Sequence, residues 1–165
     1  IFGTLHVAME MFAGAAGIQL FHIPYQGGGP AVTALLGGQV QALASGPAAA
    51  VGQIQAGKMR ALAGWGAKRL ALMPDLPTFM ELGYKDVEFY IWAGVVAPAA
   101  IPPNVQHRLR AAVRAAVADP QFVGAMNKVR TPINYLDAPE FKDFWVADAN
   151  RLRAAVLKIG KAAGK

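Results

Sequence analysis

Apolar residues in the first ninety positions alternate between the repeat of a helix and the short runs typical of strands. Leu5, Ala8 and Phe12 recur at helical spacing, and Gly17 follows as a stop signal. By the same criteria the sequence predicts helices over 5–16, 28–36 and 47–56, and strands over 20–25, 40–44 and 59–65. Strands that alternate with helices at this spacing indicate βαβ units around a mostly parallel sheet.

The pattern changes near residue 88. A loop with one short helix, punctuated by Pro74, Pro77 and Gly83, leads into a strongly apolar strand predicted over 87–96. Beyond the prolines that follow it, the sequence predicts helices over 103–117 and 121–128 and a last helix from Pro139. We therefore divide the chain into an α/β part, 1–88, and a part of one strand and helices, 89–165, which has too few strands to close a core alone.

Composition restricts the class of protein. The chain has 165 residues, of which 55% are hydrophobic, enough for one sizeable core or two small lobes. No window reaches the roughly 18 uninterrupted apolar residues of a membrane span, so a soluble protein is expected. The absence of cysteine excludes disulfides and thiolate metal sites. Because the first residue is Ile1 and not Met, we expect the chain to begin after processing or to be a piece of a longer protein.

The net charge of +6 lies entirely beyond residue 100, where eleven basic residues face five acidic ones; residues 1–100 carry five of each. The basic residues follow helical patterns and lack interleaved aromatic residues. They indicate solvated helix faces and not a surface for nucleic acid.

The glycine turn Gly27-Gly28-Gly29 follows a predicted strand that ends at Tyr25 and opens a predicted helix. Backbone N–H groups in the first turn of a helix lack partners within the helix, and the helix dipole adds positive potential there. Such a turn is either a simple connection or an anion site. It is neither a dinucleotide fingerprint nor a P-loop, because G-x-G-x-x-G and Gly-Lys-Ser/Thr are both absent.

Two further junctions offer similar donors. Thr4 is predicted to cap the first helix, with the amide of Leu5 behind it, and Ser45-Gly46 precedes the third helix at Pro47. In an open parallel sheet, junctions that follow strands lie together at the carboxyl edge, where ligands bind.

Signals for catalysis or a metal are weak by comparison. His6, His22 and His107 do not have metal-ligand spacing, and no nucleophile elbow is present. The sequence therefore predicts no metal, no cofactor and no catalytic residue.

With these segments in view, the chain resembles the substrate-binding proteins of tripartite tricarboxylate transporters, often called Bug receptors. The resemblance extends over essentially the whole chain. Its matching stretches begin with 4–10, 22–31, 36–40, 55–63 and 67–69, and continue with 75–78, 81–84, 92–98 and 118–120.

The resemblance implies a type II periplasmic binding protein, in which two α/β lobes joined by crossing strands close on a small carboxylate. Members are about twice as long as this chain, so 1–88 is expected to be a near-complete second lobe. Residues 89–165 are expected to be the strand and helices that return to a largely missing first lobe. A periplasmic location and membrane subunits of a transporter as partners are implied as well.

The resemblance also implies a role for the donors named above. Ligand contacts would come from Thr4, Leu5, Tyr25, Gly27, Gly28, Gly29, Ser45 and Gly46. Gln26 stands where relatives commonly have Lys or Arg, which removes a cation beside the turn. Trp65 stands where a small polar residue is usual and either lines the cleft or belongs to the core.

Two alternatives remain at this point. The chain is either a small α/β enzyme that uses the glycine turn as a phosphate or oxyanion site, or an inactive fragment. Such a fragment would form a homodimer through the surface exposed by the missing half.

Overall fold

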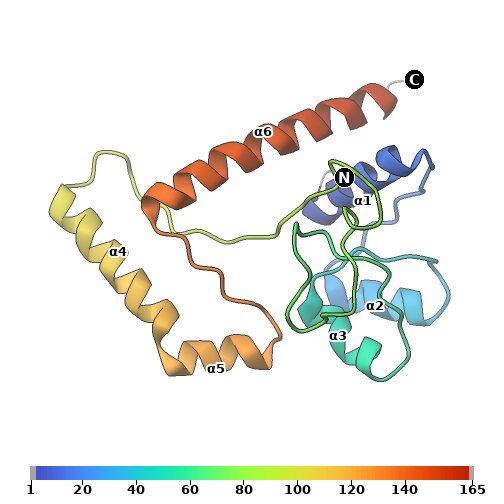
Figure 1. Ribbon diagram of the computed structural model, residues 1–165, viewed down its shortest axis with the longest axis horizontal. Helices are drawn as coiled ribbons and strands as arrows, with labels where there is room; N and C mark the ends of the chain where they lie inside the picture. The colour runs from blue at the N-terminus through green and yellow to red at the C-terminus, as the bar shows by residue number, and fades with distance from the viewer. Residues whose placement is uncertain (1–2, 164–165) are drawn as a thin grey trace. The chain divides into compact units, whose positions relative to one another are not determined.

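The computed structural model of the protein describes residues 3–163. Helices joined by extended segments and turns follow one another along these residues (Figure 1). They are α1 (Thr4–Ala16), α2 (Gly28–Leu36), α3 (Pro47–Gln55), α4 (Pro103–Ala118), α5 (Pro120–Lys128) and α6 (Ala138–Ala163).

Six of the seven predicted helices are confirmed, and each bound that was predicted for them lies within one residue of the observed one. Their ends follow from local chemistry. Gly17 ends α1 in the left-handed region at a φ of 66°. Asp119 begins α5 by accepting the amides of Gln121 and Phe122 on its side chain, and Pro120 occupies the first helical position, where no N–H is needed.

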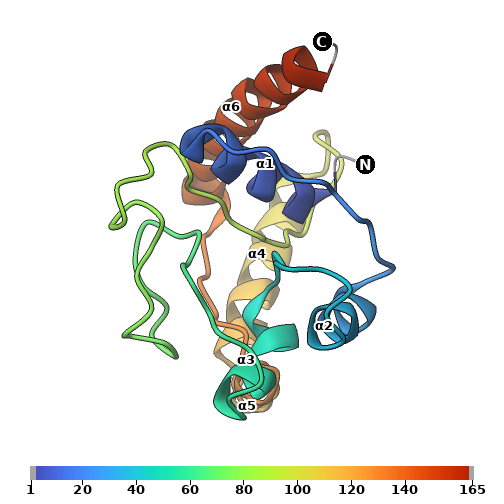
Figure 2. The ribbon, with the colours of Figure 1, turned by 90° about the vertical axis from the view of Figure 1, so that its right-hand side faces the viewer.

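The prediction of a mostly parallel sheet is wrong for the part of the chain that the structure describes. Non-helical segments occupy the predicted strand positions, but the recorded strand pairing is one isolated parallel bridge between Gly64 and Thr78. Figure 2 accordingly draws the connections between α1, α2 and α3 without arrows. The apolar pattern predicts an extended backbone, whereas a strand also needs a second segment at hydrogen-bonding distance, which is a non-local condition.

The short helix predicted in the loop before residue 84 is replaced by a hydrogen-bonded turn. Within it, the carbonyl of Thr78 accepts the amide of Leu82 at 3.1 Å. Glu81 accepts the Nε of Arg69 at 3.0 Å and the amide of Thr78 at 2.7 Å. The bond from Arg69, followed by that from the Thr78 amide, lowers the pKa of Glu81. Side-chain contacts therefore stabilise this turn without a helix.

The chain forms two compact units, one containing the chain up to Ile91 and again from Ala154, the other Trp92–Arg153. In the first unit the buried apolar side chains are Val7, Ala8, Ala13, Ala31, Val32, Ala34, Ala50, Val51, Val87 and Phe89. They come from α1, α2, α3 and the extended segment after residue 86. Helix α2 contacts α3, so the first three helices supply most of this small core. The division at residue 88 into two lobes stays a prediction.

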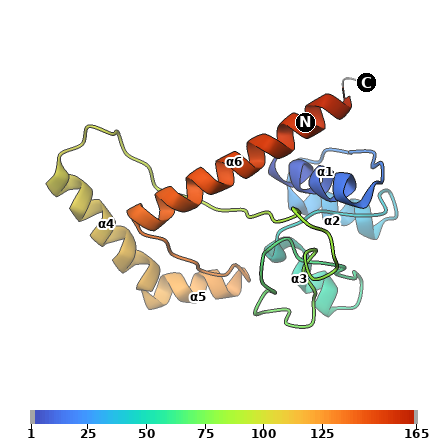
Figure 3. The same ribbon diagram turned by 45° about the horizontal axis from the view of Figure 1, so that its top comes forward.

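The second unit is held together differently. Among its residues, all of which the structure describes, none of the apolar side chains is fully buried. Helices α4 and α5 meet at Asp119 and contact each other, as Figure 3 shows. Arg110 and Arg114 of α4 both bind the carboxylate of Asp137, which also accepts the amide of Ala138 at the start of α6. Ion pairs and aromatic contacts thus organise the second unit.

No helix found within residues 3–163 is both long enough and apolar enough to cross a membrane.

Candidate functional site

The N-terminus of α2 presents two backbone donors that have no partner inside the helix. The first four N–H positions of this helix are those of Gly27, Gly28, Gly29 and Pro30. The amide of Gly27 bonds to the carbonyl of Tyr25 at 3.0 Å, and Pro30 has no N–H. The amides of Gly28 and Gly29 are therefore the donors that this turn offers.

Gly27 and Gly28 have different reasons to be glycine. Gly27 has a φ of 98° and a ψ of 175°, a conformation that residues with a Cβ rarely adopt. At Gly28 an added Cβ would lie 2.9 Å from the Cβ of Ala49, whereas at Gly29 it would meet nothing within 4 Å. Gly27 thus makes the turn, Gly28 lets α2 approach α3, and the Cβ position of Gly29 is open.

The contact between Gly28 and Ala49 brings two helix N-termini together, because Ala49 lies in the first turn of α3. In that turn the Ala49 amide bonds to the carbonyl of Gly46 at 3.2 Å, and Pro47 again lacks an N–H. The amides of Gly46 and Ala48 are left as donors. The hydroxyl of Ser45 donates to the Gly46 carbonyl at 3.1 Å, so Ser45 has to rotate before it can donate to a ligand.

At the first junction the predicted cap is wrong. Gly3 and not Thr4 is the N-cap of α1, without a side-chain cap bond, and the Gly3 carbonyl accepts the amide of Val7 at 3.1 Å. The helix begins one residue earlier than the apolar repeat, so Thr4 is its first residue and is exposed. The amides of Thr4 and Leu5 consequently belong to the first turn of α1 and have no partner within the helix.

Two histidines connect this junction with the segment before the glycine turn. The rings of His6 and His22 stack with their centroids 3.9 Å apart and their planes at 23°. The Nε2 of His6 also lies 3.5 Å from a carboxylate oxygen of Glu10. Loss of hydration, followed by the nearby His6, lowers the pKa of His22. Sequence reasoning missed this pair and the contact of Gly28 with Ala49, because neither non-local contact leaves a signal in local spacing.

The three junctions share one electrostatic feature. None of α1, α2 and α3 has an acidic residue in its first turn. The partial positive potential of each N-terminus is therefore not neutralised by the helix's own side chains, and Gln26 beside the turn is neutral. Such an arrangement favours a small anion held by backbone amides.

Trp65 belongs to a group of aromatic rings. Its ring centroid lies 4.5 Å from that of Phe79, which in turn lies 4.7 Å from Phe12 of α1. The Trp65 carbonyl also accepts the amide of Phe89 at 3.0 Å. Trp65 is partly exposed, as is Tyr25. This packing gives Trp65 contacts within the first unit, and both the core role and the contact with a ligand stay predictions.

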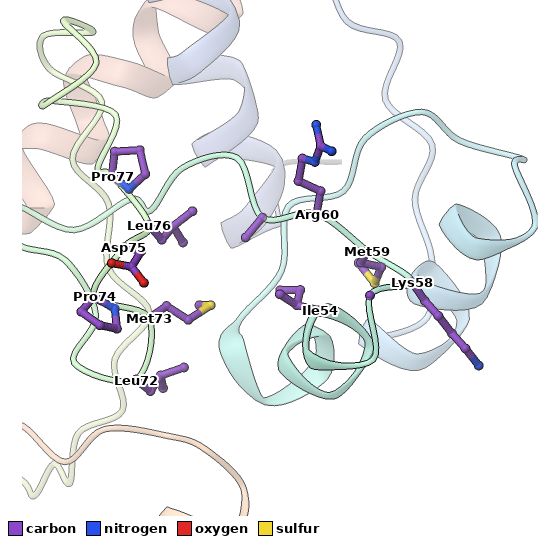
Figure 4. A pocket seen from close by; sticks show the side chains of 12 residues that line it. Ile54, Lys58, Met59, Arg60, Leu72, Met73, Pro74, Asp75, Leu76 and Pro77 are labelled. Atoms are coloured by element: carbon purple, nitrogen blue, oxygen red, sulfur yellow. The ribbon is translucent and has the colours of Figure 1, made fainter.

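A separate open groove of about 790 Å³ lies beside the end of α3 (Figure 4). One side is formed by Ile54 and residues 57–61, the other by residues 72–77. None of the predicted ligand contacts lines it. Leu72, Met73 and Leu76 extend toward the side formed by Ile54, while Lys58 extends away from the groove.

The described part of the chain holds no group of three or more His, Asp or Glu side chains arranged to bind a metal ion. The chemistry available at the junctions is hydrogen-bond donation from amides and small hydroxyls.

Comparison with known proteins relates this geometry to a family. The sequence pattern of the family described as "Tripartite tricarboxylate transporter family receptor" matches residues 1–161. The chain is 35% identical over 159 residues to the UPF0065 protein in the gbd 5' region of Cupriavidus necator, covering 96% of this chain and 48% of that protein. The chain thus spans about half the length of the curated relatives it matches.

Solved structures give the same result for the fold. A TctC solute-binding protein from Polaromonas superposes with a TM-score of 0.81 at 24% identity, over 95% of this chain and 54% of that one. An R. palustris protein with adipate gives 0.72 at 26% identity, over 98% and 53%. The periplasmic binding protein BugD gives 0.71 at 30% identity, over 98% and 54%. The backbone therefore follows that of TctC-type periplasmic binding proteins even where it forms no sheet.

Proposed function

The chain belongs to the tripartite tricarboxylate transporter receptor family, and we propose that it supplies one wall of a carboxylate-binding cleft in an extracytoplasmic solute receptor. This family consists of binding proteins and not enzymes, so capture of a solute is favoured over the enzyme alternative. Its relatives are periplasmic binding proteins, and one is described with adipate. We extend to this chain a periplasmic location, a small organic carboxylate as ligand, and the membrane subunits of a transporter as partners.

The observation that carries the proposal is the pair of donors at Gly28 and Gly29 above a turn that only glycine adopts easily. A carboxylate has two oxygens, and two successive amides at a helix start can each donate to one of them. Gly27 forms the turn, and Tyr25 beside it adds an aromatic side chain that is half-buried.

The first and third junctions would hold the remaining polar groups of the ligand. Thr4 and Leu5 offer amides at the start of α1, and the Thr4 hydroxyl is exposed. Ser45 and Gly46 offer a hydroxyl and an amide beside α3. Trp65 is the ninth contact in this proposal, and it reaches the ligand only if its partly exposed ring edge faces the cleft, because its ring also packs against Phe79.

Calorimetric titration with a panel of carboxylates, adipate among them, tests the proposal. Because the chain spans about half the length of its relatives, we expect weak binding by this chain alone and tight binding by a longer protein that includes it. Folding is checked by circular dichroism before each titration. Absence of binding by the longer, folded protein to every carboxylate would contradict the proposal, and tight binding by this chain alone would contradict the need for a second wall.

A variant at the turn tests whether the backbone amide of Gly29 contributes to carboxylate binding. Gly29→Pro removes one donor at a helical position where proline is tolerated, and Gly52→Ala within α3 is the control because an added Cβ there meets nothing within 4 Å. We expect the proline to weaken carboxylate binding by about tenfold, the value of one charge-assisted hydrogen bond. Equal binding by both variants would remove Gly29 from the site.

A further inference from the structure

One side of the groove beside α3 belongs to a loop, residues 70–77, that contains two backbone-bonded turns. The amide of Met73 donates to the carbonyl of Leu70 at 2.9 Å, and the amide of Leu76 donates to the carbonyl of Met73 at 3.1 Å. Met73 and Leu76 are half-buried and extend toward the side formed by Ile54 (Figure 4). Local opening is easiest where few apolar contacts are buried, so these turns need further contacts to stay in place.

The end of this loop is fixed by the isolated parallel bridge. The amide of Gly64 donates to the carbonyl of Pro77 at 2.8 Å, and the carbonyl of Gly64 accepts the amide of Phe79 at 2.9 Å. Thr78, between Pro77 and Phe79, is 1% exposed. The amide of Gly64 therefore reports whether the end of the loop stays in its place.

Arg69, immediately before the loop, binds both the middle of the loop and the residues that follow it. Its Nη1 donates to the carbonyl of Pro74 at 3.0 Å, and its Nε lies 3.0 Å from both carboxylate oxygens of Glu81. Glu81 in turn accepts the amide of Thr78 at 2.7 Å and donates its own amide to the Thr78 hydroxyl at 3.1 Å. The side chains of Arg69 and Glu81 are each 44% exposed, so salt can screen the pair.

From these contacts we propose that Arg69 and Glu81 form a salt-sensitive clasp that holds the loop 70–77 in place as one side of the groove. While the clasp is formed, the loop cannot move away from Ile54 without breaking the bond from Arg69 to Pro74 or the ion pair. When the clasp is broken, the loop opens and the groove widens. The clasp, the loop and the groove all lie in the first unit, and the inference does not depend on the proposed ligand.

Amide exchange followed by NMR on the whole chain tests the clasp residue by residue. In Arg69→Ala we expect the amides of Gly64, Met73 and Leu76, which all donate backbone hydrogen bonds, to exchange about fivefold faster, the factor for a strong exposed ion pair. The amides of α1 should keep their rates. The matched control is Lys68→Ala, which removes an exposed positive charge next to Arg69 but leaves the clasp intact, and should change none of these rates.

Salt tests the clasp without any substitution. Raising the NaCl concentration from about 0.1 M to about 1 M shortens the screening length from about 10 Å to about 3 Å. In the unaltered protein the amides of Met73 and Leu76 should then exchange about twofold faster relative to those of α1, whereas in Arg69→Ala salt should make no such difference. Glu81→Gln keeps a side-chain oxygen for the Thr78 amide but removes the charge, so it should respond as Arg69→Ala does.

Distances between two spin labels measure the groove itself. The chain has no cysteine, so Lys58→Cys and Asp75→Cys place one label on each side of the groove without competing sites. Adding Arg69→Ala should give a longer and broader distribution of label distances.

The clasp is supported if the loop amides, their response to salt and the label distance all change as expected. It is overturned if Met73 and Leu76 keep their exchange rates in Arg69→Ala, or if Lys68→Ala accelerates them as much. It is also overturned if the amides of α1 accelerate equally, if salt acts alike on the unaltered protein and on Arg69→Ala, or if the label distance stays the same.

Discussion

Single glycines set the geometry of the candidate site, and each does so for its own reason. Gly27 supplies a backbone conformation at a φ of 98°, whereas Gly28 supplies the space that lets α2 touch Ala49 of α3. From the sequence the three glycines of the turn are equivalent. The structure distinguishes them by torsion angle and by what a Cβ would meet.

Gly28→Ala is expected to destabilise the fold. Its Cβ would lie 2.9 Å from that of Ala49, and relief of such an overlap between two helices costs about 1–3 kcal/mol. Gly29→Ala is the matched control, since a Cβ there meets nothing within 4 Å, and we expect a change of about 0.5 kcal/mol or less. Urea unfolding followed by circular dichroism measures both. Equal stability of the two variants would show that α2 and α3 can separate without cost.

The stacked histidines predict a dependence of stability on pH. The pKa of His22 is lowered from 6.5 by loss of hydration and by His6, and Glu10 partly opposes this. As pH falls below 6.5 the unfolded chain binds a proton that the folded chain resists, so the free energy of unfolding decreases. His22→Gln should flatten this decrease, whereas His107→Gln, in α4, should retain it. Urea unfolding between pH 5 and pH 7.5 measures the free energy of unfolding of each variant. If this free energy depends on pH in His22→Gln as it does in the unaltered protein, the expectation is contradicted.

Charged side chains connect the helices of the second unit, whereas the helices of the first unit bury apolar side chains. Asp137 precedes α6 and accepts Arg110 Nε at 3.0 Å, Arg110 Nη2 at 2.9 Å and the Ala138 amide at 2.8 Å, besides its contact with Arg114. Its carboxylate thus connects α4 to the start of α6. A local pattern of helices gives no indication of this connection, because the partners are 23 to 27 residues apart in the sequence.

Acid should weaken this connection. Arg110, followed by the Ala138 amide, holds the pKa of Asp137 well below its usual 3.8. The resulting stabilisation is complete above that value and is lost as pH falls toward the pKa of the folded state. Asp137→Asn should therefore remove part of the acid sensitivity between pH 4 and pH 2, seen as a flatter dependence of the melting temperature on pH. Asp143→Asn, exposed in α6, is the control and should keep the original slope.

At the scale of the whole molecule, the two units differ in how many apolar side chains they bury. All of the fully buried apolar side chains recorded for residues 3–163 lie in the first unit, on α1, α2, α3 and the segment with Val87 and Phe89. Large apolar side chains are exposed by more than a third in both units, for example Phe21 and Leu62 in the first and Leu109 and Trp145 in the second. Such a surface suits contact with further protein, either a second lobe or a second copy of the chain; the homodimer stays a prediction.

Amide exchange should reflect this difference. Local opening is easiest where few apolar contacts are buried, so we expect the amides of α4 and α5 to exchange at least tenfold faster than those of α1 and α2. Mass spectrometry on the intact chain measures both groups in one experiment. Sedimentation at rising concentration shows whether the chain associates. Slower exchange in α4 than in α1, in a sample shown to be monomeric, would contradict the expectation.

Local sequence determined where the helices of this protein lie and which helix starts offer free backbone amides. Apolar spacing, glycine stops and prolines at first helical positions act within a few residues, so 28–36 and 47–55 are readable as helices and the glycine turn as a source of free amides. The order of motifs along the chain was sufficient to indicate the receptor family, which the comparisons confirm.

Only the tertiary structure decided which extended segments pair and which side chains meet. Four predicted strands gave a single bridge at Gly64 and Thr78, because pairing needs a partner brought from elsewhere in the chain. The same applies to His6 with His22, Gly28 with Ala49, and Asp148 with Trp92. Short-range propensity fixes the conformation of a segment, whereas the identity of its neighbours depends on the path of the whole chain.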